Sequence, residues 1–472
     1  MSSKELNKYE YNWPYFNPLE DKHWIHNKET KSYVRQMPED PDELAKDSRW
    51  PGFFPSAICF VTTSDGEITA LEKVVGASIV NRFPYIVALS FCTEPLSDRH
   101  YARNKFNETL EKGGGVSIHY FEPGDKINKV MNSINTVDDS EIEKRIPETN
   151  LPTRKAMSND SPVFEDAYLV YEARLVKPGK DFDGNPIFEK PYTDFGSHRI
   201  YYLEIDAIQL REDIAFGKSQ IYWQSLPHWS AKPENENLGF KKSVSQIDSA
   251  YQKGYTPNYY FPALNTIAFE YDKIENDMAV KLLPPLPEDQ VEVDNDRARW
   301  PCFFPSSAGM ITTWGENGVP NLMPCGSTTV FIRHPLCIGI CVSYAEINIR
   351  YAPRATLDAL EKNGKFGCGV PFINDKVIEA IKYAGNISIK HDINKIENSG
   401  LEIFPNEWSP VLSALPIHFD CEVKKVVRLG THFLYLGEVK AIRLREDISI
   451  ENPLTWYPYP DVLKEKVPVA VE

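Results

Sequence analysis

The chain has 472 residues, 42% of them hydrophobic and 12% aromatic, which is enough apolar material for two or three folded domains. Its 67 acidic residues outnumber 52 lysines and arginines, and the formal charge of −15 opposes nonspecific binding to nucleic acid or anionic lipid. The eight cysteines form no CxxC pair and no zinc-like spacing with histidine, so neither a disulfide framework nor a metal site is indicated.

The amino-terminal segment, residues 1–16, lacks the basic stretch and apolar run of a secretory signal. No segment approaches the roughly 20 apolar residues that cross a bilayer. We therefore expect a cytoplasmic protein with neither a nucleic acid nor a membrane as its partner.

The first elements predicted along the chain are strands. Residues 56–63 and 67–78 flank the turn Asp65-Gly66 and are typical of a hairpin. Residues 85–92, YIVALSFC, form a nearly continuous apolar run that indicates a buried strand. Residues 197–210 predict one more long strand.

Much of this first half returns later in the chain. The octapeptide RWPGFFPS at 49–56 recurs as RWPCFFPS at 299–306, a spacing of 250 residues (299 − 49), and AIQLREDI at 207–214 recurs at 441–448, a spacing of 234 (441 − 207). The first copy therefore carries 16 extra residues (250 − 234). Repeats of this length indicate a duplicated domain, and a polar stretch at 233–246 places the boundary near residue 240, giving domains 1–240 and 241–472. The aromatic octapeptide is suited to packing.

The second half predicts the same elements again: a hairpin over 309–323 with the turn Asn317-Gly318, a buried strand over 336–343 and a long strand over 431–444. Residues 353–364 predict a helix with Pro353 at its first position, and Gly364 follows its last turn. The expected fold is mainly β with peripheral α-helices, a small closed barrel made twice.

The second copy resembles the flavin reductase-like domain, the FMN-binding split barrel. The resemblance depends on five features in order: Thr312-Thr313, the loop from Asn321 to Thr328, the Pro-led strand 335–343, Arg354 with Thr356, and residues 430–439. It implies FMN as cofactor, with Asn321 among the flavin-binding residues, and NADH or NADPH as a substrate.

The first copy matches this pattern less well. By the 250-residue spacing Leu71 stands in place of Asn321 and Phe106 in place of Thr356, which weakens the expectation that this copy binds flavin. Such domains usually pair as homodimers with the flavin near the interface. The resemblance therefore implies two tandem split β-barrels that form a fused pseudo-dimer, and it allows further homo-oligomers.

Two clusters are candidates for holding the flavin phosphate. In the second copy Arg354 and Thr356 fall in the first turn of a helix, whose free N–H groups attract anions, and Ser327 and Thr328 add donors from the loop. The alternative is a solvated arginine and a local cap. In the first copy a basic cluster surrounds a helix start, where an anion would relieve repulsion between cations, unless the cluster is only a solvated surface; its candidates are Arg99, Arg103 and Lys105.

The flavin ring needs a close approach to backbone, and Gly326 among small residues permits it. Met323 and Cys325 flank this position, although a free cysteine is more often inert packing. His432 projects to the same strand face as Leu434 and Leu436. It is either a core histidine or, as the resemblance implies, part of the flavin and nicotinamide site, where we assign it as the catalytic candidate.

Three functions remain open on the sequence. The first is an FMN-dependent oxidoreductase of flavin reductase type that aligns NAD(P)H with the flavin, where the cofactors carry the reaction. The second is a flavin-holding electron carrier, or a specialised redox enzyme, that takes electrons from a protein partner. The third is a non-catalytic duplicated barrel that binds a small ligand.

Overall fold

The computed structural model describes residues 24–39, 56–81, 84–94, 102–122, 125–181, 183–215, 225–226, 272–274, 276–283, 307–345, 354–371 and 375–447. Residues 49–55 and 299–306 of the octapeptides, and the predicted boundary near residue 240, lie outside these ranges. No helix in the described segments has the length and apolar character needed to cross a membrane.

The second half of the chain forms a closed barrel of six antiparallel strands. The strands follow one another around the barrel in the order β26, β21, β20, β19, β22 and β25, and β25 pairs with β26 to close the ring. The closed barrel confirms the predicted fold class. Its strands are β19 (Ser307–Trp314), β20 (Pro320–Arg333), β21 (Leu336–Ser343), β22 (Lys365–Val370), β25 (Ile417–Arg428) and β26 (His432–Arg445).

Helices and short strands cover this barrel at its periphery. Helix α9 (Ala355–Asn363) places Leu357 and Leu360 in the barrel core, and its C-cap Gly364 has φ 61°, the left-handed conformation that favours glycine. On the outer face of β20, Leu322 packs against α10 (Asp375–Asn386) and α11 (Lys395–Asn398). The other elements are η6 (Glu316–Gly318), β23 (Ile403–Phe404) and β24 (Val411–Leu412).

The first half repeats this barrel with one strand divided in two. Its strands run in the order β5, β4, β8, β11, β15, β7 and β6, and the short link between β5 and β6 takes the place of the middle of β20. The barrel strands are β4 (Cys59–Ser64), β5 (Thr69–Val74), β6 (Ala77–Asn81), β7 (Ile86–Cys92), β8 (Gly115–Tyr120), β11 (Leu169–Leu175) and β15 (His198–Arg211).

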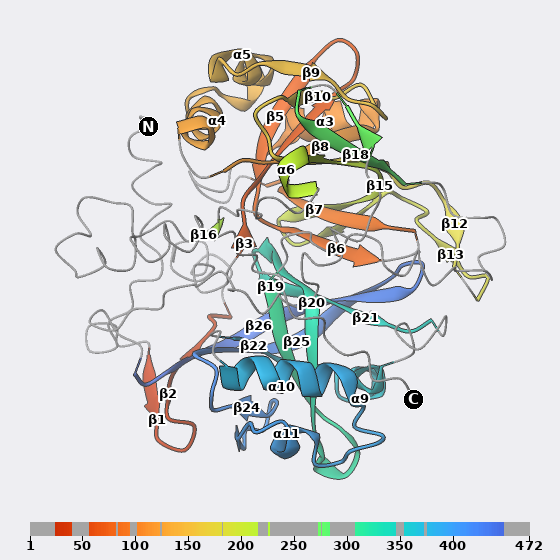
Figure 1. Cartoon of the computed structure of the whole chain (residues 1–472). Coiled ribbons are helices and arrows are strands. Elements are labelled where there is room, and N and C mark those ends of the chain that lie inside the picture. Colours follow the sequence, from red (N-terminus) through yellow and green to blue (C-terminus); the bar gives the residue numbers. More distant parts are fainter. Residues whose placement is uncertain are drawn as a thin grey trace.

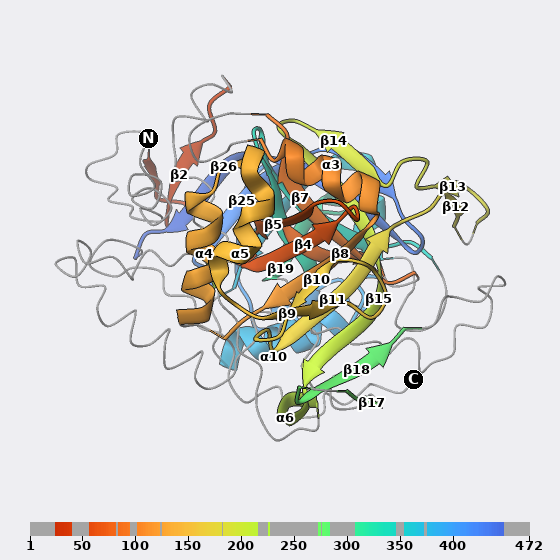
Figure 2. The same ribbon diagram turned by 90° about the horizontal axis from the view of Figure 1, so that it is seen from above.

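Peripheral elements also surround the first barrel. They are β3 (Ser56–Ala57), α3 (Asn104–Gly113), α4 (Asp125–Thr136), η2 (Asp139–Lys144), α5 (Arg145–Thr149), β9 (Thr153–Lys155), β10 (Pro162–Phe164), β12 (Gly179–Lys180), β13 (Pro186–Ile187), β14 (Tyr192–Phe195), α6 (Glu212–Ala215) and β16 (Ser225–Leu226). Figures 1 and 2 show α4 and α5 on the outside of this barrel.

The extra residues of the first copy lie mostly between β11 and β15. The spacing between the copies is 248 at Leu169 and Ile417, which pair with the equivalent residues Leu210 and Leu444. It falls to 234 at His198 and His432. Fourteen (248 − 234) of the 16 extra residues therefore build the segment that contains β12, β13 and β14, which the second copy lacks.

The two barrels pack against each other along a shared apolar seam. The seam core combines side chains from β6, β7 and β15 with side chains from β20, β21 and β26, and the Ser90 hydroxyl donates to the carbonyl of Phe331 across it. Figure 1 shows the two barrels stacked with this seam between them. The chain is a fused pseudo-dimer, as predicted.

Each barrel also receives a hairpin from the segment that precedes the other barrel. The hairpin β1 (Ile25–Asn27) and β2 (Ser32–Gln36) pairs with β26, whereas β17 (Asp272–Lys273) and β18 (Met278–Leu282) pair with β15. Figure 1 shows β2, near the red end of the colour scale, beside the lower barrel and the green β18 in the upper one. The registers are equivalent, since β2 begins opposite Arg445 and β18 begins opposite Arg211. The exchange ties the two halves together.

One sequence equivalence needs correction. Asn321 lies opposite Thr313, but the residue opposite Thr63 in the first barrel is Ala70 and not Leu71. The first hairpin loop, residues 65–68, is one residue shorter than the loop 315–319, which shifts β5 by one position. Glu72, opposite Val61, is therefore the counterpart of Met323, opposite Ile311.

Candidate functional site

The start of α9 is anchored on β20. The amide nitrogen of Asn321 donates to the hydroxyl of Thr356 over 3.1 Å and lies 3.4 Å from the hydroxyl of Thr313. All three side chains are buried. The structure thus brings Asn321 and Thr356 together, and their polar groups hold the helix start against the strand.

Arg354 is the N-cap residue of α9. Its backbone N–H donates to the carbonyl of Ser343 at the end of β21 over 3.1 Å, its side chain is exposed, and no side chain caps the helix. The hydroxyl of Ser343 is buried, with no hydrogen-bond partner within the described part of the chain. An uncapped helix start and an unsatisfied hydroxyl beside an arginine suit an anionic ligand.

Lys395, the first residue of α11, supplies a second cation. Its side chain is only 5% exposed, and among the described residues its ammonium group has no hydrogen-bond or ion-pair partner. Burial, with repulsion from Arg354, lowers the pKa of Lys395 to about 8, although Asp392 acts in the opposite sense. A buried ammonium without a counter-ion is costly, and a bound anion would remove that cost.

The small-residue part of β20 contains a bulge. Gly309 pairs with Cys325 while Ser307 pairs with Thr328, so β20 carries one extra residue at Gly326 and Ser327. Ser327 is half-buried there, whereas the hydroxyl of Thr328 is buried and donates to the carbonyl of Cys325 over 3.0 Å. A bulge leaves backbone groups unpaired beside the strand, so Gly326 and Ser327 offer main-chain contacts to a ligand.

The side chains of Met323 and Cys325 face the barrel interior. Cys325 is part of the barrel core, and its thiol lies 3.5 Å from the carbonyl of Cys341. Burial raises the pKa of the Cys325 thiol. Met323 packs against the same core. The thiol of Cys325 therefore packs in the barrel core, and its contact with a flavin stays a prediction.

His432 lies at the seam between the halves. It pairs directly with Ser343, the residue whose carbonyl accepts the Arg354 N–H. Its Nδ1 is 2.7 Å from the Thr431 hydroxyl, and the side-chain oxygen of Asn81 accepts from both the N–H (2.7 Å) and the hydroxyl (2.8 Å) of Thr431. The first half thus positions the His432 imidazole through Asn81.

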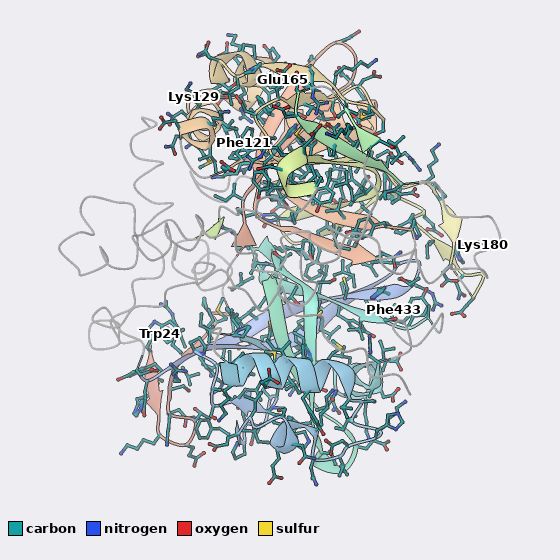
Figure 3. All side chains as sticks on the ribbon, viewed as in Figure 1. Trp24, Phe121, Lys129, Glu165, Lys180 and Phe433 are labelled. Atoms are coloured by element: carbon teal, nitrogen blue, oxygen red, sulfur yellow. The ribbon has the colours of Figure 1, made fainter. Side chains whose placement is uncertain are left out.

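The extra segment of the first copy reaches the same end of the second barrel. The Asp181 carboxylate accepts from the hydroxyl of Tyr344 over 2.9 Å and from the guanidinium of Arg428, which lies 4.4 Å from the centre of the Tyr344 ring. Burial opposes ionisation, but these hydrogen bonds together lower the pKa of Asp181. Figure 3 shows Lys180 of this segment on the side of the molecule where Phe433 lies. The Phe433 ring packs against Tyr344 in a tilted arrangement, 4.4 Å between ring centres.

The first barrel has two arginines at the corresponding places, around a buried carboxylate. The N–H of Arg103 donates to the carbonyl of Cys92 at the end of β7, as the N–H of Arg354 does to Ser343. Arg145 opens α5 as Lys395 opens α11. Glu72, fully buried, lies 2.7 Å from Arg145 Nη1 and 3.6 Å from Arg103 Nε.

The start of α3 is likewise satisfied from within the chain. The N–H of Lys105 donates to the Asp139 carboxylate over 3.0 Å. Counted from the cap glycines Gly114 and Gly364, Phe106 replaces Thr356, and its buried ring stacks on Phe91. Arg103 and Lys105 therefore contact carboxylates of their own chain. Arg99 lies outside the described residues.

Sequence reasoning missed Lys395, Ser343 and Asn81. Lys395 stands 250 residues after Arg145 (395 − 145), so a longer comparison of the copies would have paired two cations at one position. Ser343 ends an apolar run and gives no sign of its orphaned hydroxyl. Asn81 acts on the other half of the chain, a contact that no local pattern contains.

Comparison with known proteins assigns a family to the second barrel. The family model described as flavin reductase like domain matches residues 302–460, so this part of the chain is similar to flavin reductase-like domains. The first barrel is related to it through its fold. No curated protein matches the chain.

Three solved structures illustrate what the chain resembles. Nitrilotriacetate monooxygenase component B from Bacillus cereus shares 19% identity over 37% of this chain and 87% of its own, with a TM-score of 0.31. Flavoredoxin of Desulfovibrio vulgaris (Miyazaki F) shares 18% over 34% and 79%, with a TM-score of 0.27. The FMN-binding protein from Thermus thermophilus with bound p-hydroxybenzaldehyde shares 19% over 30% and 72%, with a TM-score of 0.25.

Proposed function

We propose that this chain is an FMN-binding oxidoreductase whose second barrel holds the flavin. The observation that carries the proposal is the buried ammonium of Lys395, which has no partner among the described residues and lies beside Arg354 at an uncapped helix start, within a stretch that matches the flavin reductase-like family. The phosphate of FMN supplies the double negative charge that this arrangement lacks.

Different residues of the site are assigned to different parts of the flavin. Arg354 and Lys395 neutralise the phosphate, the N–H groups of the first turn of α9 and the Ser343 hydroxyl donate to it, and Asn321 fixes the helix through Thr356. The bulge at Gly326 and Ser327 supplies main-chain contacts, and His432 is held at the seam by the Thr431–Asn81 contacts.

When bound, FMN supplies a ring that can take up a hydride, and we assign NADH or NADPH as the donor. The contribution of the protein is then to orient the two ligands and to exclude water between them. His432, on the seam face of β26, is the side chain assigned to the nicotinamide side of the site.

The absorption spectrum of the protein tests the proposal directly. Purified protein mixed with FMN and freed of unbound ligand is expected to stay yellow, and anaerobic NADH or NADPH is expected to bleach the colour. Protein that stays colourless after FMN treatment would contradict flavin binding. Retained colour with no response to either nucleotide would instead favour an electron carrier that is reduced by a protein partner.

The pH dependence of FMN binding follows from Lys395. The ammonium of the free protein loses its proton as the pH rises through about 8, so binding above that pH requires proton uptake. The dissociation constant is expected to rise up to about tenfold per pH unit between pH 8 and 9.5. The phosphate, with a second pKa near 6, keeps its charge over this range.

Fluorescence titrations with FMN and with riboflavin, at intervals from pH 7 to 9.5, measure this dependence. Riboflavin lacks the phosphate and is expected to show no such change. FMN affinity that stays constant from pH 7 to 9.5 would show that the Lys395 ammonium does not bind the phosphate.

A further inference from the structure

The first barrel retains the cations of the phosphate site but holds them around carboxylates of its own. Glu72 is completely buried, and both of its oxygens are used: Oε1 accepts from the Lys73 N–H over 2.9 Å, and Oε2 lies 2.7 Å from Arg145 Nη1. The arginine side chain is equally buried, at 1% exposure. The carboxylate therefore has partners for both oxygens within its own barrel.

The second carboxylate covers the helix start. Asp139 Oδ2 accepts from the Lys105 N–H in the first turn of α3, over 3.0 Å, and Oδ1 lies 3.9 Å from Arg145 Nη2. A phosphate at the start of α9 would use the equivalent N–H groups and the equivalent cation. Glu72 and Asp139 together therefore offer negative oxygens to the donors that bind an anion at such a helix start.

The second barrel has apolar residues at both positions. Met323 occupies the strand position of Glu72, as the strand registers show. Ile389 corresponds to Asp139, since the helices before and after them, α4 with α10 and α5 with α11, both begin 250 residues apart. Both barrels keep cations at two helix starts, those of α3 and α5 or of α9 and α11. Only the first barrel has carboxylates at the positions of Met323 and Ile389.

We propose that Glu72 and Asp139 take, within the first barrel, the place that a ligand phosphate takes in the second, so that the chain binds one flavin at its second barrel only. This inference rests on the proposed function for its ligand. The first barrel then serves as the partner that completes the seam. Its own anion site is latent, because Glu72 pairs with the cations that would bind a phosphate.

The number of flavins per chain tests this inference. Titration of the full chain with FMN is expected to give one bound flavin, and the double variant Arg354→Ala/Lys395→Met is expected to give none. Two flavins per wild-type chain, or one flavin left in the double variant, would overturn the inference. A wild-type chain that binds no FMN would count against the proposed function, and the phosphate experiment below would then decide the inference by itself.

The latent site can be opened by removing the Glu72 charge. In the Arg354→Ala/Lys395→Met background we add Glu72→Gln, which keeps the side-chain volume, and measure thermal unfolding with and without inorganic phosphate. Phosphate is expected to raise the unfolding temperature of the Glu72→Gln protein by about 2 °C or more, and to leave the background protein unchanged.

The control for this experiment is Glu67→Gln, an exposed carboxylate in the same hairpin, which should respond to phosphate as the background does. Equal responses of the Glu72→Gln and Glu67→Gln proteins would contradict the inference. If Glu72→Gln prevents folding, the number of flavins bound by the wild-type chain and by the double variant still tests whether only the second barrel binds flavin.

Discussion

Replacing Lys395 with methionine is expected to weaken FMN binding roughly 30- to 150-fold and to stabilise the flavin-free protein. A charge-assisted hydrogen bond to the phosphate contributes about 2–3 kcal/mol to binding. In the free protein Lys395 is 5% exposed, and among the described residues its ammonium group has no ion-pair partner, so an apolar side chain of similar length removes a desolvation cost. Equilibrium titration with FMN and urea unfolding without flavin measure the two effects.

The opposite signs of the two effects separate a binding role from a structural one. Riboflavin affinity should be equal in wild type and Lys395→Met, because riboflavin has no phosphate. The matched control is Lys390→Met, since Lys390 is exposed and contacts Asp358 at 3.7 Å; it should change neither quantity by more than about 0.5 kcal/mol. A destabilised Lys395→Met protein with wild-type FMN affinity would show that Lys395 only supports the fold.

The predictions that succeeded depend on local patterns. Alternating and continuous apolar runs predicted the barrel strands, because one face or both faces of each strand are buried. The helix predicted over 353–364 is α9, Ala355–Asn363, followed by the left-handed Gly364. The repeat itself predicted the pairing of two like barrels, since a duplicated domain carries the same seam surface twice.

The features that were not predicted from the sequence depend on contacts between distant segments or on the length of a single turn. The exchange of β1–β2 and β17–β18 between the barrels is set by pairing with strands in the other half of the chain, and no local pattern shows which edge a hairpin will join. The shift that places Ala70 opposite Thr63 arises from one missing residue in a loop. Because of that shift, Glu72 could not be recognised from the sequence as the counterpart of Met323.

The two halves contribute unequally to the proposed flavin site. The second barrel supplies Arg354, Lys395 and the uncapped helix, while the first supplies Asn81, which fixes Thr431 and through it His432. The extra segment of the first half adds Asp181, which holds Tyr344. The proposed absence of a flavin in the first barrel is therefore compatible with every contact that this barrel makes across the seam.

Replacing Phe331 with alanine is expected to lower the free energy of unfolding by about 3–5 kcal/mol and to weaken both barrels together. Phe331 is 2% exposed in the seam core, where it lies among apolar side chains of both halves. Its ring covers Gly339, where an added Cβ would come within 2.3 Å of the ring. Gly339 has no side chain that could fill the space left by the ring, so the variant leaves a cavity.

Urea unfolding and amide hydrogen exchange of β7 and β21 measure this effect. Since β7 belongs to the first barrel and β21 to the second, a shared seam requires protection to fall in both strands. Val426→Ala, at a side chain that is 47% exposed, serves as the control and should cost no more than about 0.5 kcal/mol. If β7 kept its protection while β21 lost it, the halves would be independent domains, and the first barrel could not position His432 through a rigid seam.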